Sequence, residues 1–292
     1  MRRFAFTLIE LIFVIVIIGV LSKFGVEFLA QMYNSFIFST INNALHSKSE
    51  IALQSIASRL QYRIKDSVIA KKPNGEFKAL ESSDYAKDAT ILEWIGSDID
   101  GYRGDELPIW SGVIDLELSN KDLLISPQTD TTAIEALIRM LSGGGSGVSD
   151  AALYFVGSNS DIQTGYGWGG AITTQNATMH PIRAASLANQ FVPINGVTGA
   201  DNDFFDVDVY EYYQLAWSAY AVVYTPDDEN LTLYYDYQPW QAESYESGKK
   251  AVIMQNVDTF EFKAIGSIIK IKVCVNTDIV EDYSLCKEKT IY

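Results

Sequence analysis

The chain has 292 residues, of which 48% are hydrophobic and 20% charged, a composition that excludes an intrinsically disordered protein. Its formal net charge is −15. A surface of this sign repels phosphate backbones, so we expect no direct binding of nucleic acid.

The chain opens with a short basic leader and an apolar run. Arg2 and Arg3 precede this run, which only Glu10 interrupts before Lys23. A secretory signal peptide has the same basic start and apolar centre, but its small cleavage-site residue follows the run, whereas Ala5 precedes it here. The positive-inside tendency keeps the basic end cytoplasmic and sends the rest of the chain outward.

Glu10 is the informative residue of this segment, because a carboxylate in a membrane helix is costly and needs a partner or a function. A solvated acid at the membrane interface is the simpler interpretation. Residues 6–10 (FTLIE), after a leader that ends in Ala5, resemble the class III signal of type IV prepilins and type II secretion pseudopilins. The chain differs from this family in having Ala5 where glycine usually precedes the cut.

The resemblance implies that a prepilin peptidase cuts between Ala5 and Phe6, methylates the amine of Phe6 and leaves Glu10 as the fifth mature residue. It also implies an inner-membrane precursor with a cytoplasmic N-terminus, other pilin or pseudopilin subunits as partners, and a periplasmic or extracellular filament. In a core of packed apolar helices, Glu10 would be uncompensated unless it met the Phe6 amine of a neighbouring subunit. Such a pair fixes register, so we expect a change of Glu10 to impair assembly more than folding.

One continuous helix is predicted from Phe6 to about Ile64, since this stretch has no proline. Residues 6–30 are apolar nearly all round and predict a transmembrane or filament-core segment. Residues 31–72 predict an amphipathic helix that continues into a globular domain, with Pro73-Asn74-Gly75 as the stop signal. Its apolar stripe has near-helical spacing and consists of Ile41, Leu45, Ala52, Ile56, Leu60 and Ile64.

Residues 73–292 predict a periplasmic or extracellular globular domain. A short helix is expected over residues 132–141, followed by a flexible glycine-rich loop or linker at residues 142–149 (SGGGSGVS). Residues 151–208 are rich in Gly, Asn, Ser and Asp, which indicates irregular loops around short strands such as residues 153–156.

The C-terminal third predicts an antiparallel sheet. Residues 217–225 and 231–237 flank a polar turn and indicate one hairpin, and residues 257–263 and 268–275 indicate a second. The fold class is therefore α+β: a long N-terminal helix, transmembrane in its first half, packed on a C-terminal antiparallel sheet in a pilin-like arrangement.

The two cysteines, Cys274 and Cys286, are compatible with a buried thiol pair, part of a metal site or a disulfide. The export implied by the N-terminal resemblance favours a disulfide. We expect the tail that carries Cys286 to fold over the outer face of the last strand. This arrangement resembles the C-terminal region of many pilins, and residues 254–264 are similar to the larger J-class pseudopilins and W-class minor pilins.

Two acidic clusters are candidates for calcium binding, and solvated loops are the simpler interpretation of both. Asp98, Asp100 and Asp105 lie in one glycine-containing segment (SDIDGYRGDE), and oxygen ligands in such loops suit calcium, although the spacing matches an EF-hand poorly. No other cofactor is expected. The second cluster consists of Asp201, Asp203, Asp206 and Asp208.

The sequence therefore predicts a minor pilin or pseudopilin, a structural subunit for type II secretion, pilus biogenesis or DNA uptake. Its 17 tyrosines and five tryptophans keep an adhesin-like tip subunit open as an alternative, although packing between strands explains most aromatic residues. A membrane-anchored periplasmic domain is the third interpretation. We predict no enzyme, because the sequence has no nucleophile elbow or phosphate loop.

Overall fold

The structure is a computed structural model that describes residues 7–158, 161–277 and 283–292. The chain divides into two compact units, Met1–Lys48 and Ser49–Tyr292, and each is described by itself. Among the described residues, the strands all lie in the second unit, so the α+β fold class predicted from the sequence is confirmed.

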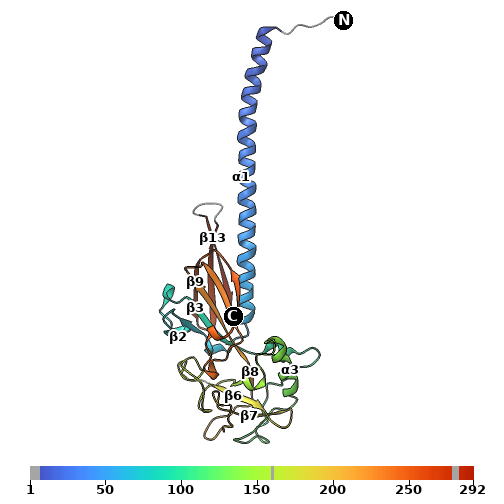
Figure 1. Ribbon diagram of the computed structural model, residues 1–292, viewed down its shortest axis with the longest axis vertical. Helices are drawn as coiled ribbons and strands as arrows, with labels where there is room; N and C mark the ends of the chain where they lie inside the picture. The colour runs from blue at the N-terminus through green and yellow to red at the C-terminus, as the bar shows by residue number, and fades with distance from the viewer. Residues whose placement is uncertain (1–6, 159–160, 278–282) are drawn as a thin grey trace. The chain divides into compact units, whose positions relative to one another are not determined.

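The long N-terminal helix is also confirmed. Helix α1 spans Leu8–Leu60, 53 residues, and is the blue helix of Figure 1. At a rise of 1.5 Å per residue it is about 80 Å long. Glu10 lies in its first turn and Arg59 in its last, and both charges complement the helix dipole.

The predicted extension of the helix to about Ile64, and of its amphipathic part to residue 72, is wrong. Helix α1 ends at Leu60, and the Ile64 amide donates to the Ile95 carbonyl at 2.8 Å instead of to a helical carbonyl. Ser97 in turn donates to the Tyr62 carbonyl at 2.8 Å. The backbone has therefore joined a sheet before Pro73 is reached.

A six-stranded antiparallel sheet forms the first layer of the globular unit, with the order β11-β10-β9-β3-β1-β2. Strands β3 and β9 lie next to each other in Figure 1. The strands are β1 (Ile69–Lys71), β2 (Phe77–Ala79), β3 (Ile91–Gly96), β9 (Ser218–Thr225), β10 (Asn230–Tyr235) and β11 (Lys249–Met254).

The hairpin predicted at residues 217–237 is confirmed as β9 and β10. Its partners differ from those expected, because β9 also pairs with β3, whose residues lie more than 100 positions earlier. The two predicted hairpins therefore belong to two different sheets rather than to one C-terminal sheet.

The second hairpin belongs to a three-stranded sheet of β12 (Val257–Ile265), β13 (Ile268–Asn276) and β14 (Ser284–Ile291). Cys274 and Cys286 are direct partners in the register of β13 and β14, and they form the predicted disulfide. The expected fold of the tail over the outer face is wrong. Residues 284–291 extend the sheet sideways instead, because antiparallel pairing with β13 satisfies their backbone groups.

The last turns of α1 belong to the globular unit and are packed within it. Leu53, Ile56 and Leu60 are completely buried, whereas Gln54 and Arg59 are exposed. Glu50 binds Lys287 and Lys289 of β14 at 2.6 and 3.3 Å. Hydrogen bonds and charges from these two lysines lower the pKa of the Glu50 carboxyl.

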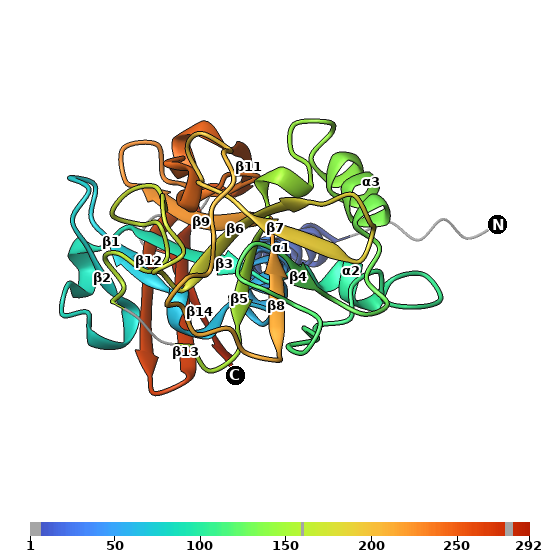
Figure 2. The same ribbon diagram turned by 90° about the horizontal axis from the view of Figure 1, so that it is seen from below.

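The middle of the chain forms a five-stranded antiparallel sheet, so the expectation of mostly irregular loops there is only partly correct (Figure 2). The predicted helix is confirmed as α3 (Thr131–Leu141), capped by Asp130 and buried at Ile134 and Ile138. In the order β4-β7-β6-β5-β8, the strands are Leu124–Ile125, Gln190–Pro193, Met179–Ala184, Ala152–Phe155 and Tyr213–Ala216.

The described part of the chain also contains one short α-helix, α2 (Ile99–Arg103), and six 3-10 turns. The turns are η1 (Lys65–Ser67), η2 (Leu80–Ser82), η3 (Ala86–Asp88), η4 (Val148–Asp150), η5 (Pro239–Gln241) and η6 (Tyr245–Ser247).

Candidate functional site

The first candidate site is the exposed apolar surface of α1 between residues 8 and 38. Leu8, Phe13 and Leu21 are 78, 67 and 64% exposed, and the other large apolar side chains up to Phe38 are at least 40% exposed, except for Ile37, which is half-buried. An exposed apolar surface of this extent marks a contact with lipid or with other proteins.

One stretch of α1 is long and apolar enough to cross a membrane, with a mean hydropathy of 2.4 over its most apolar 18 residues. The helix has no charged side chain between Glu10 and Lys23, and Lys23 pairs with Glu27 at 4.0 Å. A lysine at such a position can extend its ammonium group to the membrane interface.

Glu10 lies on this apolar surface with its side chain exposed. Its amide donates to the Thr7 carbonyl at 3.1 Å, which fixes the backbone of the first helical turn. The expected cleavage point between Ala5 and Phe6 lies outside the described residues. The carboxylate is thus accessible to a partner.

The structure does not assemble Asp98, Asp100 and Asp105 into a calcium site. Within residues 7–158, 161–277 and 283–292 there is no group of three or more His, Cys, Asp or Glu side chains placed to hold a metal ion. Asp98 is buried, and its carboxylate caps α2 by accepting from the Gly101 amide at 3.2 Å and from Trp110 Nε1 at 3.1 Å. Burial raises the pKa of Asp98 to about 6.

Two acids of the second cluster form ion pairs next to the five-stranded sheet. Asp201 accepts from Arg183 at 2.7 Å, and Asp203 binds Lys121 at 3.1 Å. The hydrogen bond from Lys121 lowers the pKa of Asp203. Asp201 therefore connects its loop to β6, and Asp203 connects two loops to each other.

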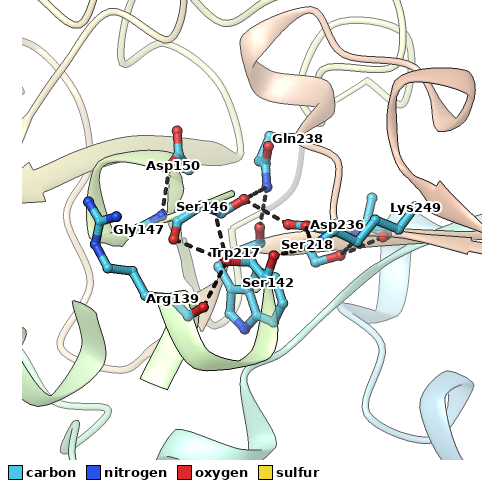
Figure 3. Close-up of polar contacts among 11 residues, drawn as sticks. Arg139, Ser142, Ser146, Gly147, Asp150, Trp217, Ser218, Asp236, Gln238 and Lys249 are labelled. Atoms are coloured by element: carbon cyan, nitrogen blue, oxygen red, sulfur yellow. Dashed lines mark hydrogen bonds and ion pairs between the residues drawn. The ribbon is translucent and has the colours of Figure 1, made fainter. Parts of the chain in front are cut away.

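Residues 142–147 form a turn between α3 and η4 inside one compact unit, so of the predicted loop or linker the loop is confirmed and the linker is wrong (Figure 3). Ser142 and Ser146 are buried, and the Ser146 amide donates to Ser142 Oγ at 2.9 Å. Ser146 Oγ donates to Asp236 at 2.7 Å, and Lys249 forms an ion pair with Asp236 at 2.9 Å. Lys249 also donates to the Ser142 carbonyl.

Sequence analysis missed a second buried acid, Glu93 of β3, which is 1% exposed. Its carboxylate binds Lys71 at 3.0 Å and accepts from the Tyr237 hydroxyl at 3.0 Å. Burial raises the pKa of Glu93, and the Lys71 charge opposes this shift. An acid inside an otherwise apolar strand sequence (ILEWIG) was the available signal, because a buried charge requires a partner.

The His180 side chain is buried and contributes no polar group to the surface. Burial lowers the pKa of its imidazole to about 3, and Nδ1 lies 3.2 Å from the Gln175 side-chain oxygen. The ring is therefore neutral at physiological pH and packs between Phe155 and Phe204.

With the geometry in place, the chain can be compared with known proteins. No protein-family model, curated protein or solved structure significantly matches it.

Proposed function

We propose that the chain is a minor pilin or pseudopilin, a structural subunit of a type IV pilus-like filament that serves type II secretion, pilus biogenesis or DNA uptake. The precursor is held in the inner membrane by α1, with its N-terminus in the cytoplasm. A prepilin peptidase removes residues 1–5 and methylates Phe6. The subunit then moves into a periplasmic or extracellular filament.

The observation that carries this proposal is the exposed apolar surface of α1 with one acid in its first turn. Lipid covers such a surface while the subunit is stored, and helices of other subunits cover it in a filament. In either setting, the Glu10 charge is costly without a partner. An amine at residue 6 of a neighbouring copy supplies one and fixes the axial register of the two helices.

The decisive measurement is the intact mass of the protein purified from its native membrane. We expect the loss of residues 1–5 and the addition of one methyl group. A matched variant, Ala5→Leu, changes the side chain before the cut and should accumulate as the full precursor. Native protein that still begins at Met1 would contradict the proposal and leave a simple membrane-anchored domain.

Assembly is tested separately with Glu10→Gln, which removes the charge at nearly constant size. We expect its amount in the sheared filament fraction to fall by about tenfold or more, while its level in the membrane stays unchanged. Glu27→Gln is the control, because Glu27 is also an exposed acid of α1 but already has Lys23 as a partner. Equal incorporation of the two variants would argue against the register role of Glu10.

A further inference from the structure

A cleft in the globular unit is lined by aromatic side chains and polar groups. It has a volume of about 350 Å³ and lies where the end of α1 meets β3, β9 and β10. Tyr62, Trp217, Tyr220 and Tyr235 contribute aromatic rings to its wall. This volume is within the range of small-molecule binding sites.

The rings are held in a row by the register of the sheet. Tyr220 is paired with Trp94 on one side and with Tyr235 on the other, so three aromatic residues cross three neighbouring strands. The Trp94 and Tyr220 rings are stacked, with centroids 5.7 Å apart. The cleft therefore has a rigid aromatic wall.

Gly96 has no side chain, and the Tyr220 ring occupies the space that a side chain there would fill. A Cβ atom at residue 96 would lie 2.5 Å from Cε2 of the Tyr220 ring, which is closer than any real contact. Glycine is therefore required if the ring is to lie flat along β3 and form part of the wall.

The polar groups around the rings include both donors and acceptors. In the described part of the chain, no side-chain partner is found for the Tyr220 and Tyr235 hydroxyls or for the Asp100 carboxylate. Burial raises the pKa of Tyr220 to about 12, so its hydroxyl keeps its proton and can donate. Arg59 uses Nη1 on Ser55, and its other nitrogens have no protein partner in the same part of the chain.

We propose that this cleft binds a neutral saccharide. Sugar rings present C–H faces that pack on aromatic rings, and hydroxyl groups that both donate and accept. Asp100 and Arg59 both line the cleft, and their opposite charges give it no field of a single sign that would favour a strongly charged ligand. The inference goes beyond the filament role and does not depend on it.

The test is a titration of the full chain, solubilised in a detergent without a sugar head group, because maltoside or glucoside detergents would themselves compete for the cleft. The probes are lactose, cellobiose, maltose and N,N′-diacetylchitobiose. We expect saturable quenching or enhancement of tryptophan fluorescence with at least one of them, with a Kd between about 10 μM and 1 mM. Trp217 and Trp94 supply the signal.

Variants at neighbouring positions of β10 provide the matched comparison. Tyr235→Ala removes a ring of the wall and should weaken binding by about tenfold or more, whereas Tyr234→Ala, on the opposite face of the strand, should change Kd by less than about twofold. Asp100→Asn, at an exposed position that folding does not need, should weaken binding by several-fold. The proposal is overturned if none of the four saccharides binds saturably, or if Tyr235→Ala and Asp100→Asn bind like the parent chain.

Discussion

Helix α1 contains two regions that are both rich in apolar residues but are used differently. Residues 8–38 carry apolar side chains on all sides and leave them exposed. In residues 49–60, the apolar side chains at Leu53, Ile56 and Leu60 share one stripe and are completely buried. The distribution of apolar residues around the helix, rather than their number, therefore separates a surface that needs an external partner from one that serves the fold.

The largest effect should come from a paired truncation in these two regions. Ile56→Ala removes a completely buried side chain and should lower the free energy of unfolding by about 3 to 4 kcal/mol. Ile15→Ala truncates the same residue type in the exposed region and should leave the free energy of unfolding unchanged. Urea denaturation in detergent, followed by tryptophan fluorescence, measures both. Equal losses would mean that residues 8–38 are part of the folded core.

The disulfide should stabilise the globular unit and not the exposed region of α1. Replacing both Cys274 and Cys286 by serine should cost about 3 kcal/mol, since the crosslink closes a loop of 12 positions. The helical signal of residues 8–38 in circular dichroism should persist at denaturant concentrations that unfold the variant's sheets. Simultaneous loss of both signals would show that the two regions unfold together.

Asp98 should give the globular unit a pH dependence. Its pKa of about 6 lies above the value near 4 of an unfolded chain, so the folded state binds the proton more tightly between these values. The free energy of unfolding should therefore fall by about 2 to 3 kcal/mol as the pH rises from 4 to 7. Asp98→Asn should remove this decline.

Asp105→Asn is the control for this titration, because Asp105 is an exposed acid of the same segment. If the free energy of unfolding of Asp98→Asn falls with rising pH as much as that of the parent chain, the pH dependence belongs to another group.

The smallest effect is expected at Glu50. Its lowered pKa means that its ion pairs stabilise the folded state above pH 4.5 and are lost as the pH falls below that value. Glu50→Gln should lower the urea midpoint slightly at low salt, and the difference should vanish in 1 M NaCl because exposed ion pairs are screened. Glu27→Gln, in the exposed region of α1, should show no shift at either salt concentration. A salt-independent difference at Glu50 would mean that packing rather than charge is lost.

The parts of the fold that sequence analysis predicted depend on nearby residues. The long helix follows from an uninterrupted apolar run, α3 from its periodicity, and each hairpin from two alternating runs around a turn. Each of these patterns can be recognised in one short, continuous stretch of the sequence. The disulfide was also predicted, but from the export that the N-terminal motif implies rather than from spacing.

What sequence analysis missed depends on residues far apart in the chain. Helix α1 stops at Leu60 because Ile64 pairs with Ile95, and the glycine-rich turn is fixed by Asp236, 90 positions from Ser146. The aromatic cleft combines residues from five separate segments. Local propensity cannot show such pairings, because tertiary contacts decide them. Cleavage between Ala5 and Phe6 and the partner proteins of the chain stay predictions.

The two edges of the six-stranded sheet limit how copies of this chain can stack. Strand β2 is only three residues long, and β11 opens with the exposed Lys249 and Lys250. Short edges and lysines oppose the main-chain pairing through which sheets of separate molecules aggregate, although Val252 is exposed on the same strand. Crowded copies are therefore protected from fusing into a continuous sheet, and contacts between them are left to side chains.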